Sequence, residues 1–180
     1  MKPYLFLLLF LSFLSCKHPE SSRYNQYQEP LPPVIETLDR EEEHIHKVIG
    51  IKDGDTFVLL IDGKEQTVRL EHIDCPEKRQ PFGTKAKQFA SDLCFGEKVV
   101  LRKSGTDRYR RIIGEIILQD GTNVNKELVK NGLAWHFKKY SKDEEYAQLE
   151  IEARINKLGL WSDSNPIAPW EFRKQPKKKK

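Results

Sequence analysis

Two short stretches of the sequence carry acidic and basic residues at spacings that could do chemistry. The first is KDGDT at residues 52–56, and the second is RLEHIDCPE at residues 69–77. If carboxylates such as Asp55 and Asp74 converge, they favour a hard cation that takes oxygen ligands. A guanidinium such as that of Arg69 beside the cation can grip two phosphate oxygens at once. A metal, an arginine and a spare carboxylate together indicate phosphodiester hydrolysis.

The elements that flank these stretches decide whether the carboxylates can meet. Alternating apolar residues predict three consecutive strands, at about residues 44–52, 55–61 and 65–73. Asp62-Gly63 between the last two is a type I′ hairpin signal. In an antiparallel meander the start of the second strand and the end of the third lie at one end of the sheet, so Asp55 and Asp74 can approach each other. As an isolated turn DGD is unremarkable, and only the second stretch favours a functional interpretation.

The rest of the domain is expected to mix two more strands with helices. The strands are predicted at residues 98–103 and 111–118, and the helices at residues 84–93, 124–130 and 142–158. Five short strands need closure to hide their edges, which predicts a small closed barrel. The expected fold class is therefore mainly β with about three α-helices, an α+β domain.

Six motifs follow one another between residues 44 and 172: IKDGDT, RLEHIDCPE, PFGTKAKQFA, DRYRR, NVNKELVKNGLA and GLW. In this order they resemble the staphylococcal nuclease (thermonuclease) family. The resemblance implies a five-stranded OB-fold barrel with three helices, and calcium-dependent hydrolysis of DNA and RNA phosphodiesters. Taken alone, DRYRR at residues 107–111 would be interpreted as a basic loop leading into the fifth strand.

The same resemblance assigns roles to the acidic residues and their neighbour. Asp55 and Asp74 match the metal-binding carboxylates, and Cys75 stands where the family supplies a backbone carbonyl ligand, usually from threonine or alanine. Asp53 matches an acidic residue near the metal. Glu77 matches the carboxylate that activates or orients the attacking water. The expected metal is Ca²⁺.

The resemblance also assigns the basic residues. Arg69 and Arg111 match the two phosphate-binding arginines, and Tyr109 matches a residue near the bound nucleotide. Arg110 replaces the glycine that the family usually has, which bears on the geometry of its loop. For the three tryptophans of the chain we expect core or helix-docking roles.

The main alternative to an enzyme is a non-catalytic OB-fold module that binds nucleic acid, since the same barrel serves for binding alone. Binding alone does not need two metal-binding carboxylates, a third carboxylate and two arginines together, so their joint presence favours the enzyme. A third interpretation is a surface-anchored adhesion or assembly protein with a vestigial site. The domain is expected to act as a monomer on DNA and/or RNA.

The N-terminal sequence predicts export. Residues 1–15 carry a lysine and then an almost wholly apolar run, as a signal peptide does. FLSC resembles a bacterial lipobox, with Cys16 as the lipidated residue that would anchor the chain to a membrane at the cell envelope; ordinary secretion is the alternative. Residues 16–42 are predicted to be a flexible tether, residues 43–172 the nuclease domain and residues 173–180 a basic tail.

Charge and cysteine content constrain this picture further. The formal net charge of +4 permits a polyanionic partner without demanding one. After export, a disulfide between Cys75 and Cys94 is chemically allowed, although a buried free cysteine is favoured for Cys94. The absence of a CxxC pair argues against a structural zinc site.

Overall fold

The computed structural model describes residues 45–176, and five strands in it form a barrel. These strands are β1 (Ile45–Asp53), β2 (Thr56–Ile61), β3 (Lys64–Leu70), β5 (Lys98–Thr106) and β6 (Ile112–Leu118). They close in the order β1-β2-β3-β6-β5, with β3 and β6 parallel and β5 returning antiparallel to β1. The predicted five-stranded barrel of the OB type is thus confirmed.

The barrel interior is filled by the apolar residues whose alternation predicted the strands. In β2, for example, the side chains of Phe57 and Leu59 are buried, whereas that of Leu60 is exposed. Adjacent strands contribute Val48, Val68 and further apolar side chains to the same core. The β2–β3 hairpin turns at Asp62 and Gly63, whose φ angles of 50° and 71° are those of the predicted type I′ turn.

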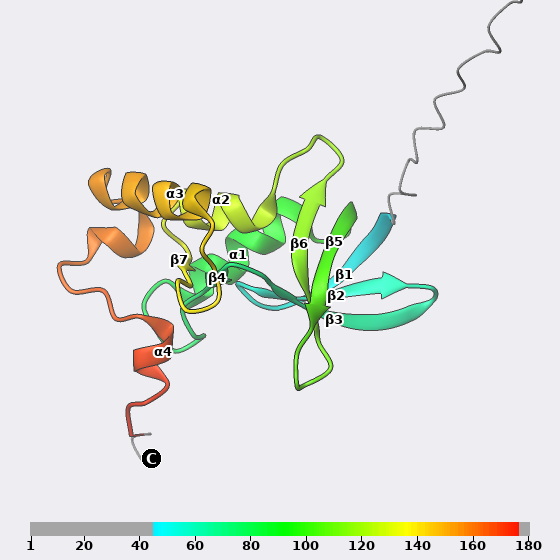
Figure 1. The fold of residues 1–180 in the computed structure, drawn as a ribbon, viewed down its shortest axis with the longest axis horizontal. Coiled ribbons are helices and arrows are strands. Elements are labelled where there is room, and N and C mark those ends of the chain that lie inside the picture. The colour runs from blue at the N-terminus through cyan, green and yellow to red at the C-terminus, as the bar shows by residue number, and fades with distance from the viewer. Residues whose placement is uncertain (1–44, 177–180) are drawn as a thin grey trace, which may run out of the picture. The chain divides into compact units, whose positions relative to one another are not determined.

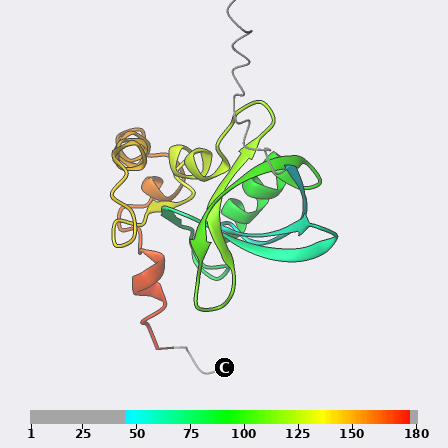
Figure 2. The ribbon, with the colours of Figure 1, turned by 45° about the vertical axis from the view of Figure 1, so that its right-hand side comes forward.

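The three α-helices that follow β6 lie to one side of the barrel in both views (Figures 1 and 2), whereas the helix that precedes β5 overlaps the barrel in Figure 2. The helices are α1 (Gly83–Cys94), α2 (Val124–Lys130), α3 (Glu144–Ile155) and α4 (Pro169–Phe172), with a 3-10 turn at Gly159–Ser162. Asn123 and Asp143 cap α2 and α3 by accepting backbone N–H groups. Because Asp143 caps it, α3 starts two residues later than predicted, and α4 adds a short fourth helix to the expected three.

The predicted third strand is interrupted, which corrects its expected end at residue 73. Strand β3 stops at Leu70, and His72 takes a left-handed conformation with φ of 66°. A left-handed residue cannot continue the pleat of a strand. The chain then forms the separate strand β4 (Ile73–Asp74), which pairs antiparallel with β7 (Trp135–His136). Asp74 therefore lies beside the barrel, on a two-stranded sheet of its own.

Several predictions from the sequence concern segments outside the described residues. The signal peptide, the lipidation at Cys16 and the tether lie before residue 45, and the KKKK end lies after residue 176. Within residues 45–176, no helix is both long and apolar enough to cross a membrane.

Candidate active site

The turn after β1 and the strand β4 bring two acidic side chains to one arginine. Thr56 pairs with Arg69 in the β2–β3 ladder, and the Leu70 N–H donates to the Asp55 carbonyl oxygen at 2.9 Å. The Nη2 atom of Arg69 lies 3.1 Å from Asp55 Oδ2 and 2.8 Å from Asp74 Oδ1. The structure thus brings together the three residues on which the predicted site rests.

The break between β3 and β4 fixes the orientation of this arginine. Arg69 Nη1 donates to the carbonyl oxygens of Leu70, at 2.8 Å, and Ile73, at 3.1 Å. These carbonyls flank the left-handed His72, so the break that ends β3 also turns two main-chain acceptors toward the guanidinium. A planar guanidinium held on one edge can present its other donors only in a fixed direction. That direction points Nη2 at the carboxylates.

Asp55 is a buried carboxylate, with only 5% of its surface exposed. The Cys75 N–H donates to its Oδ2 at 2.6 Å. Burial raises the pKa of Asp55 to about 7, against the attraction of Arg69, and the nearby Asp53 and Asp74 charges add to the rise. Burial is the largest of these effects and outweighs the attraction of Arg69. The site therefore holds more negative charge than its surroundings stabilise.

The glycine of the DGD turn is required by close packing. A Cβ atom on Gly54 would lie 2.9 Å from the Cβ atoms of Cys75 and Ala86 and from the Cys75 sulfur. Cys75 and Cys94 are both buried and carry free thiols, so no disulfide constrains the site. Burial raises the pKa of Cys94 to about 12 and that of Cys75 well above its ordinary value, which keeps both thiols protonated.

Both backbone polar groups of Glu77 are hydrogen-bonded to Gln80. Its N–H donates to Gln80 Oε1 at 2.8 Å, and its carbonyl accepts the Gln80 N–H at 2.8 Å. The first residue of α1, Gly83, packs so closely that a Cβ there would lie 2.1 Å from the Glu77 carbonyl oxygen. The side chain of Glu77 nevertheless remains 41% exposed, so water can reach its carboxylate.

A second arginine reaches the carboxylates from the C-terminus, and sequence reasoning missed it. Arg173 follows α4; its Nη2 lies 2.7 Å from Asp74 Oδ2, and its Nη1 lies 2.8 Å from Glu77 Oε1. The hydrogen bond to Asp74 is the main cause that raises the pKa of this guanidinium. The sequence alone places Arg173 in the predicted basic tail. The signal that could have found it is the preceding PWEF, because proline and large apolar residues indicate the start of a docked helix.

Arg111 and Tyr109 form a separate group at the β5–β6 turn. The Arg111 Nε donates to Asp107 Oδ2 at 2.8 Å, and Asp107 Oδ1 accepts the N–H groups of Tyr109 and Arg111. Burial acts to raise the pKa of Asp107, but these bonds lower it below its usual value. Arg110 is left-handed, with φ of 65°, as suits a position where the family usually has glycine. Within the described part of the chain, no hydrogen bond or ion pair joins this group to the cluster around Arg69.

A hard divalent cation fits the chemistry of the donors around Asp55. Both Asp55 and Asp74 direct a buried carboxylate oxygen at the same guanidinium nitrogen, and the buried Oδ1 of Asp53 has no hydrogen-bond partner. A buried oxygen without a partner beside two carboxylates needs a water molecule or a cation. Over residues 45–176, no three His, Cys, Asp or Glu side chains gather as a metal site. Main-chain and water oxygens would therefore complete the coordination, as hard cations accept.

Fold and site together define a class of protein. A closed OB-type barrel that carries buried carboxylates and guanidiniums beside one rim has the groups needed to hydrolyse a phosphate ester. The family profile described as "Staphylococcal nuclease homologue" matches residues 67–163 of the chain. The chain belongs to this family.

Similar proteins include three bacterial relatives that match most of their own length. An "Uncharacterized endonuclease" of Haemophilus influenzae is 44% identical over 137 residues, which cover 76% of each chain. An "Uncharacterized endonuclease" of Escherichia coli is 39% identical over 127 residues, covering 71% of this chain and 83% of the relative. A "Micrococcal nuclease" of Shigella flexneri is 38% identical over 141 residues, covering 73% and 81%. These relationships make the chain a hydrolase of the phosphodiesterase class.

Proposed function

We propose that this chain is a calcium-dependent nuclease that cleaves DNA and/or RNA by in-line attack of water on phosphorus. The observation that carries the proposal is the meeting of Asp55 and Asp74 at Arg69, with Glu77 held beside them. The names of the relatives support the substrate class, since they are called endonucleases or a micrococcal nuclease.

The acidic residues have distinct tasks in this proposal. Asp55 and Asp74, with the main-chain carbonyl of Cys75, hold the cation, and Asp53 holds water beside it. Bound Ca²⁺ supplies positive charge that polarises a non-bridging phosphate oxygen. Glu77 orients the attacking water and accepts its proton, a task that suits a carboxylate on a tied loop with an exposed end.

The arginines stabilise the charge that gathers on the pentacoordinate phosphorus. The Nη1 atom of Arg69 is fixed by two carbonyl oxygens, and its Nη2 atom, which now contacts Asp55 and Asp74, would donate to the phosphate once a cation neutralises these carboxylates. The side chain of Arg111 is held by Asp107 through Nε, and neither of its terminal nitrogens has a hydrogen-bond partner among residues 45–176. Both are free to donate to one phosphate. Tyr109, 64% exposed beside this guanidinium, can contact the nucleotide.

The energetic demand explains why several groups are needed. Phosphodiesters are so inert that a useful rate requires a barrier reduction on the order of 20 kcal/mol. A single electrostatic or acid–base group supplies a factor of about a hundred or more. We therefore expect Glu77→Gln and Arg111→Ala each to lower turnover by at least about a hundredfold.

The test compares cleavage of single-stranded DNA, double-stranded DNA and RNA in Ca²⁺ and in chelator. Matched controls are Glu65→Gln and Arg102→Ala, since both residues are exposed on barrel strands away from the cluster. We expect Ca²⁺-dependent cleavage that both controls retain and both site variants lose. Full turnover in either site variant would refute its role. Tight binding without cleavage in every metal tested would instead indicate a barrel that only binds nucleic acid.

We also propose that the chain is exported and anchored to a membrane through a lipid on Cys16. The support is the apolar run at residues 1–15 followed by the lipobox-like FLSC. Fractionation of cells that express the protein should place it with membranes, and Cys16→Ser should release it. An unchanged distribution in this variant would contradict the anchor. We expect the purified protein to sediment as a monomer.

A further inference from the structure

The C-terminal segment is seated on the domain next to the carboxylate cluster. The Trp170 ring stacks on Phe137 with centroids 5.1 Å apart, and it meets the Trp135 ring edge-on at 5.5 Å. Ala168 and Pro169, just before it, are buried. The aromatic contacts hold α4 in place and confirm the docking role expected for Trp170.

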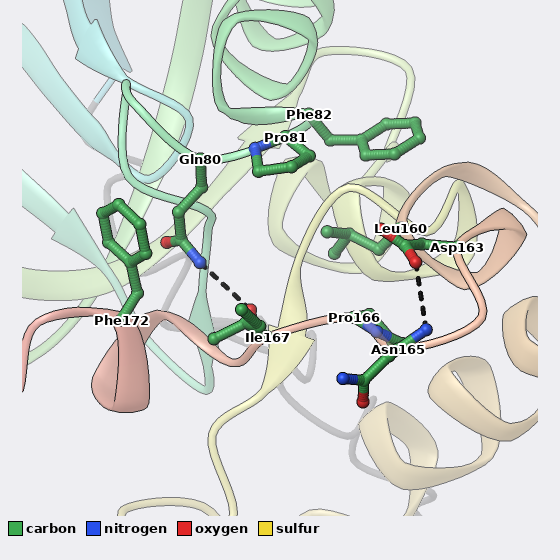
Figure 3. A pocket seen from close by; sticks show the side chains of 9 residues that line it. All are labelled: Gln80, Pro81, Phe82, Leu160, Asp163, Asn165, Pro166, Ile167 and Phe172. Atoms are coloured by element: carbon green, nitrogen blue, oxygen red, sulfur yellow. Dashed lines mark hydrogen bonds between the residues drawn. The ribbon is translucent and has the colours of Figure 1, made fainter. Parts of the chain in front are cut away.

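The same segment is tied to the loop that carries Glu77. Figure 3 shows Gln80 pointing toward the C-terminal segment, where its Nε2 donates to the Ile167 carbonyl at 3.0 Å. The other end of this amide, Oε1, accepts the Glu77 N–H. Phe172 lines the small hollow between Gln80 and Ile167. One buried side chain thus fixes α4 and the Glu77 loop relative to each other.

At the end of α4 the guanidinium of Arg173 lies where it contacts two acidic residues at once. Its Nη2 is 2.7 Å from Asp74 Oδ2, its Nη1 is 3.3 Å from Asp74 Oδ1, and the same Nη1 is 2.8 Å from Glu77 Oε1. Since Arg69 also donates to Asp74 Oδ1, both oxygens of Asp74 are engaged by guanidiniums. A carboxylate in this state offers little free lone-pair direction to a metal ion.

The charges of the carboxylate cluster also indicate that Arg173 competes with a metal ion. Within residues 45–176, the ion pairs of Asp55, Asp74 and Glu77 are with Arg69 and Arg173, and the carboxylate of Asp53 adds a fourth negative charge near Asp55. Removing the Arg173 charge leaves the cluster with a larger excess of negative charge, which strengthens its attraction for a divalent cation. With Arg173 in place, a metal must compete with a positive charge that is already bound.

We propose that Arg173 is an internal counter-cation that a divalent metal must displace from Asp74 and Glu77, so that it sets the calcium affinity of the site. This inference rests on the proposed calcium-dependent function. Displacement needs only the side chain to leave, because α4 is held by Trp170 and Gln80 independently of Arg173. The Arg173 side chain is 45% exposed, so solvent can receive it.

The test is calorimetric titration of the purified, metal-free protein with CaCl₂ in the absence of nucleic acid. The variant is Arg173→Gln, which removes the charge and keeps much of the chain length. Arg173→Lys keeps the charge but has one compact ammonium that cannot bridge both carboxylates as a planar fork does. The control is Lys174→Gln, one position further on, where the ammonium pairs with Glu171 at 2.9 Å.

We expect Arg173→Gln to bind Ca²⁺ at least about tenfold more tightly than the unaltered protein, the factor that one charge-assisted hydrogen bond represents. Arg173→Lys should lie between the two, and Lys174→Gln should match the unaltered protein. A second readout is the thermal midpoint in chelator, which should fall in Arg173→Gln and return when Ca²⁺ is added.

The possible outcomes separate this inference from the proposed function. Equal or weaker Ca²⁺ binding by Arg173→Gln, in a protein whose cleavage of DNA still requires Ca²⁺, would overturn the inference and leave the nuclease assignment intact. Failure of the unaltered protein and of every variant to bind Ca²⁺ would overturn both. Tighter binding supports the inference whether or not turnover changes.

Discussion

Replacing Asp55 by asparagine should stabilise the metal-free protein at neutral and higher pH. The change keeps the shape of the side chain and an oxygen that can accept the Cys75 N–H, while it removes a buried charge. In the folded protein the pKa of Asp55 rises from its ordinary 3.8 to about 7, chiefly because of burial. Each pKa unit corresponds to about 1.36 kcal/mol, so this rise sets an upper limit of roughly 4 kcal/mol.

The sign follows from proton binding. Between about pH 4 and 7 the folded protein holds a proton on Asp55 that the unfolded chain has released, so stability falls as the pH rises through this window. Above the window both states are ionised, and the folded state bears the whole cost. Asparagine does not titrate. The substitution does remove the ion pair between residue 55 and Arg69, and it can turn the asparagine NH₂ group toward the guanidinium. We therefore expect a gain of about 2 kcal/mol at about pH 8 that fades toward about pH 4.

Urea unfolding of both proteins in chelator, at several pH values between about 4 and 8, measures this difference. Added Ca²⁺ should stabilise the unaltered protein more than Asp55→Asn and so narrow the gap at high pH. Parallel pH profiles for the two proteins would show that Asp55 does not titrate in this range. A less stable Asp55→Asn at high pH would show that Arg69, not burial, dominates its environment.

Three further substitutions test how the site is held. Gly83→Ala places a Cβ 2.1 Å from the Glu77 carbonyl and should destabilise the protein by about 3 kcal/mol in urea unfolding, whereas Gly105→Ala, with open space around it, should not. Gln80→Ala should lower the free energy of unfolding by about 2 kcal/mol and also lower turnover, because the Glu77 N–H and the Ile167 carbonyl lose their partner. Its control, Gln88→Ala, breaks an exposed hydrogen bond to Asp92 and should change neither quantity. Arg110→Gly should raise stability by up to about 1 kcal/mol because it relieves a left-handed arginine, and an unchanged or lower unfolding midpoint would contradict this.

The barrel could be predicted from the sequence because its signals are local. Short apolar runs rich in β-branched residues mark β2 and β6, and Asp62-Gly63 fixes a hairpin without help from the rest of the chain. The pairing of β4 with β7 had no such signal, since two residues on each side form no periodic pattern. Nor does the sequence indicate a left-handed His72, because this conformation is set by the tertiary contacts on either side.

The site divides in the same way. Hairpin topology alone predicts that Asp55 and Asp74 can meet, whereas the roles of Glu77 and Arg111 come only from the family resemblance. Neither argument predicts Arg173, because it lies 99 residues from Asp74 in the sequence and contacts it through the docking of Trp170 on Phe137. The sequence PWEF indicates that a helix docks there, but the residues that Arg173 then reaches depend on long-range packing.

Two carboxylates of this site are incompletely stabilised by the protein alone. Asp55 is buried at a cost that an asparagine would avoid, and Asp53 keeps a buried oxygen without a partner. Buried charges that are incompletely paired lower stability, so the fold itself gains nothing from these two residues. A divalent cation would relieve both conditions at once, in exchange for the contact of Arg173 with Asp74. The free energy that Asp55→Asn recovers in chelator is therefore part of what drives metal binding in the unaltered protein. Urea unfolding measures it as a gain in stability, and calcium titration measures it as part of the binding free energy.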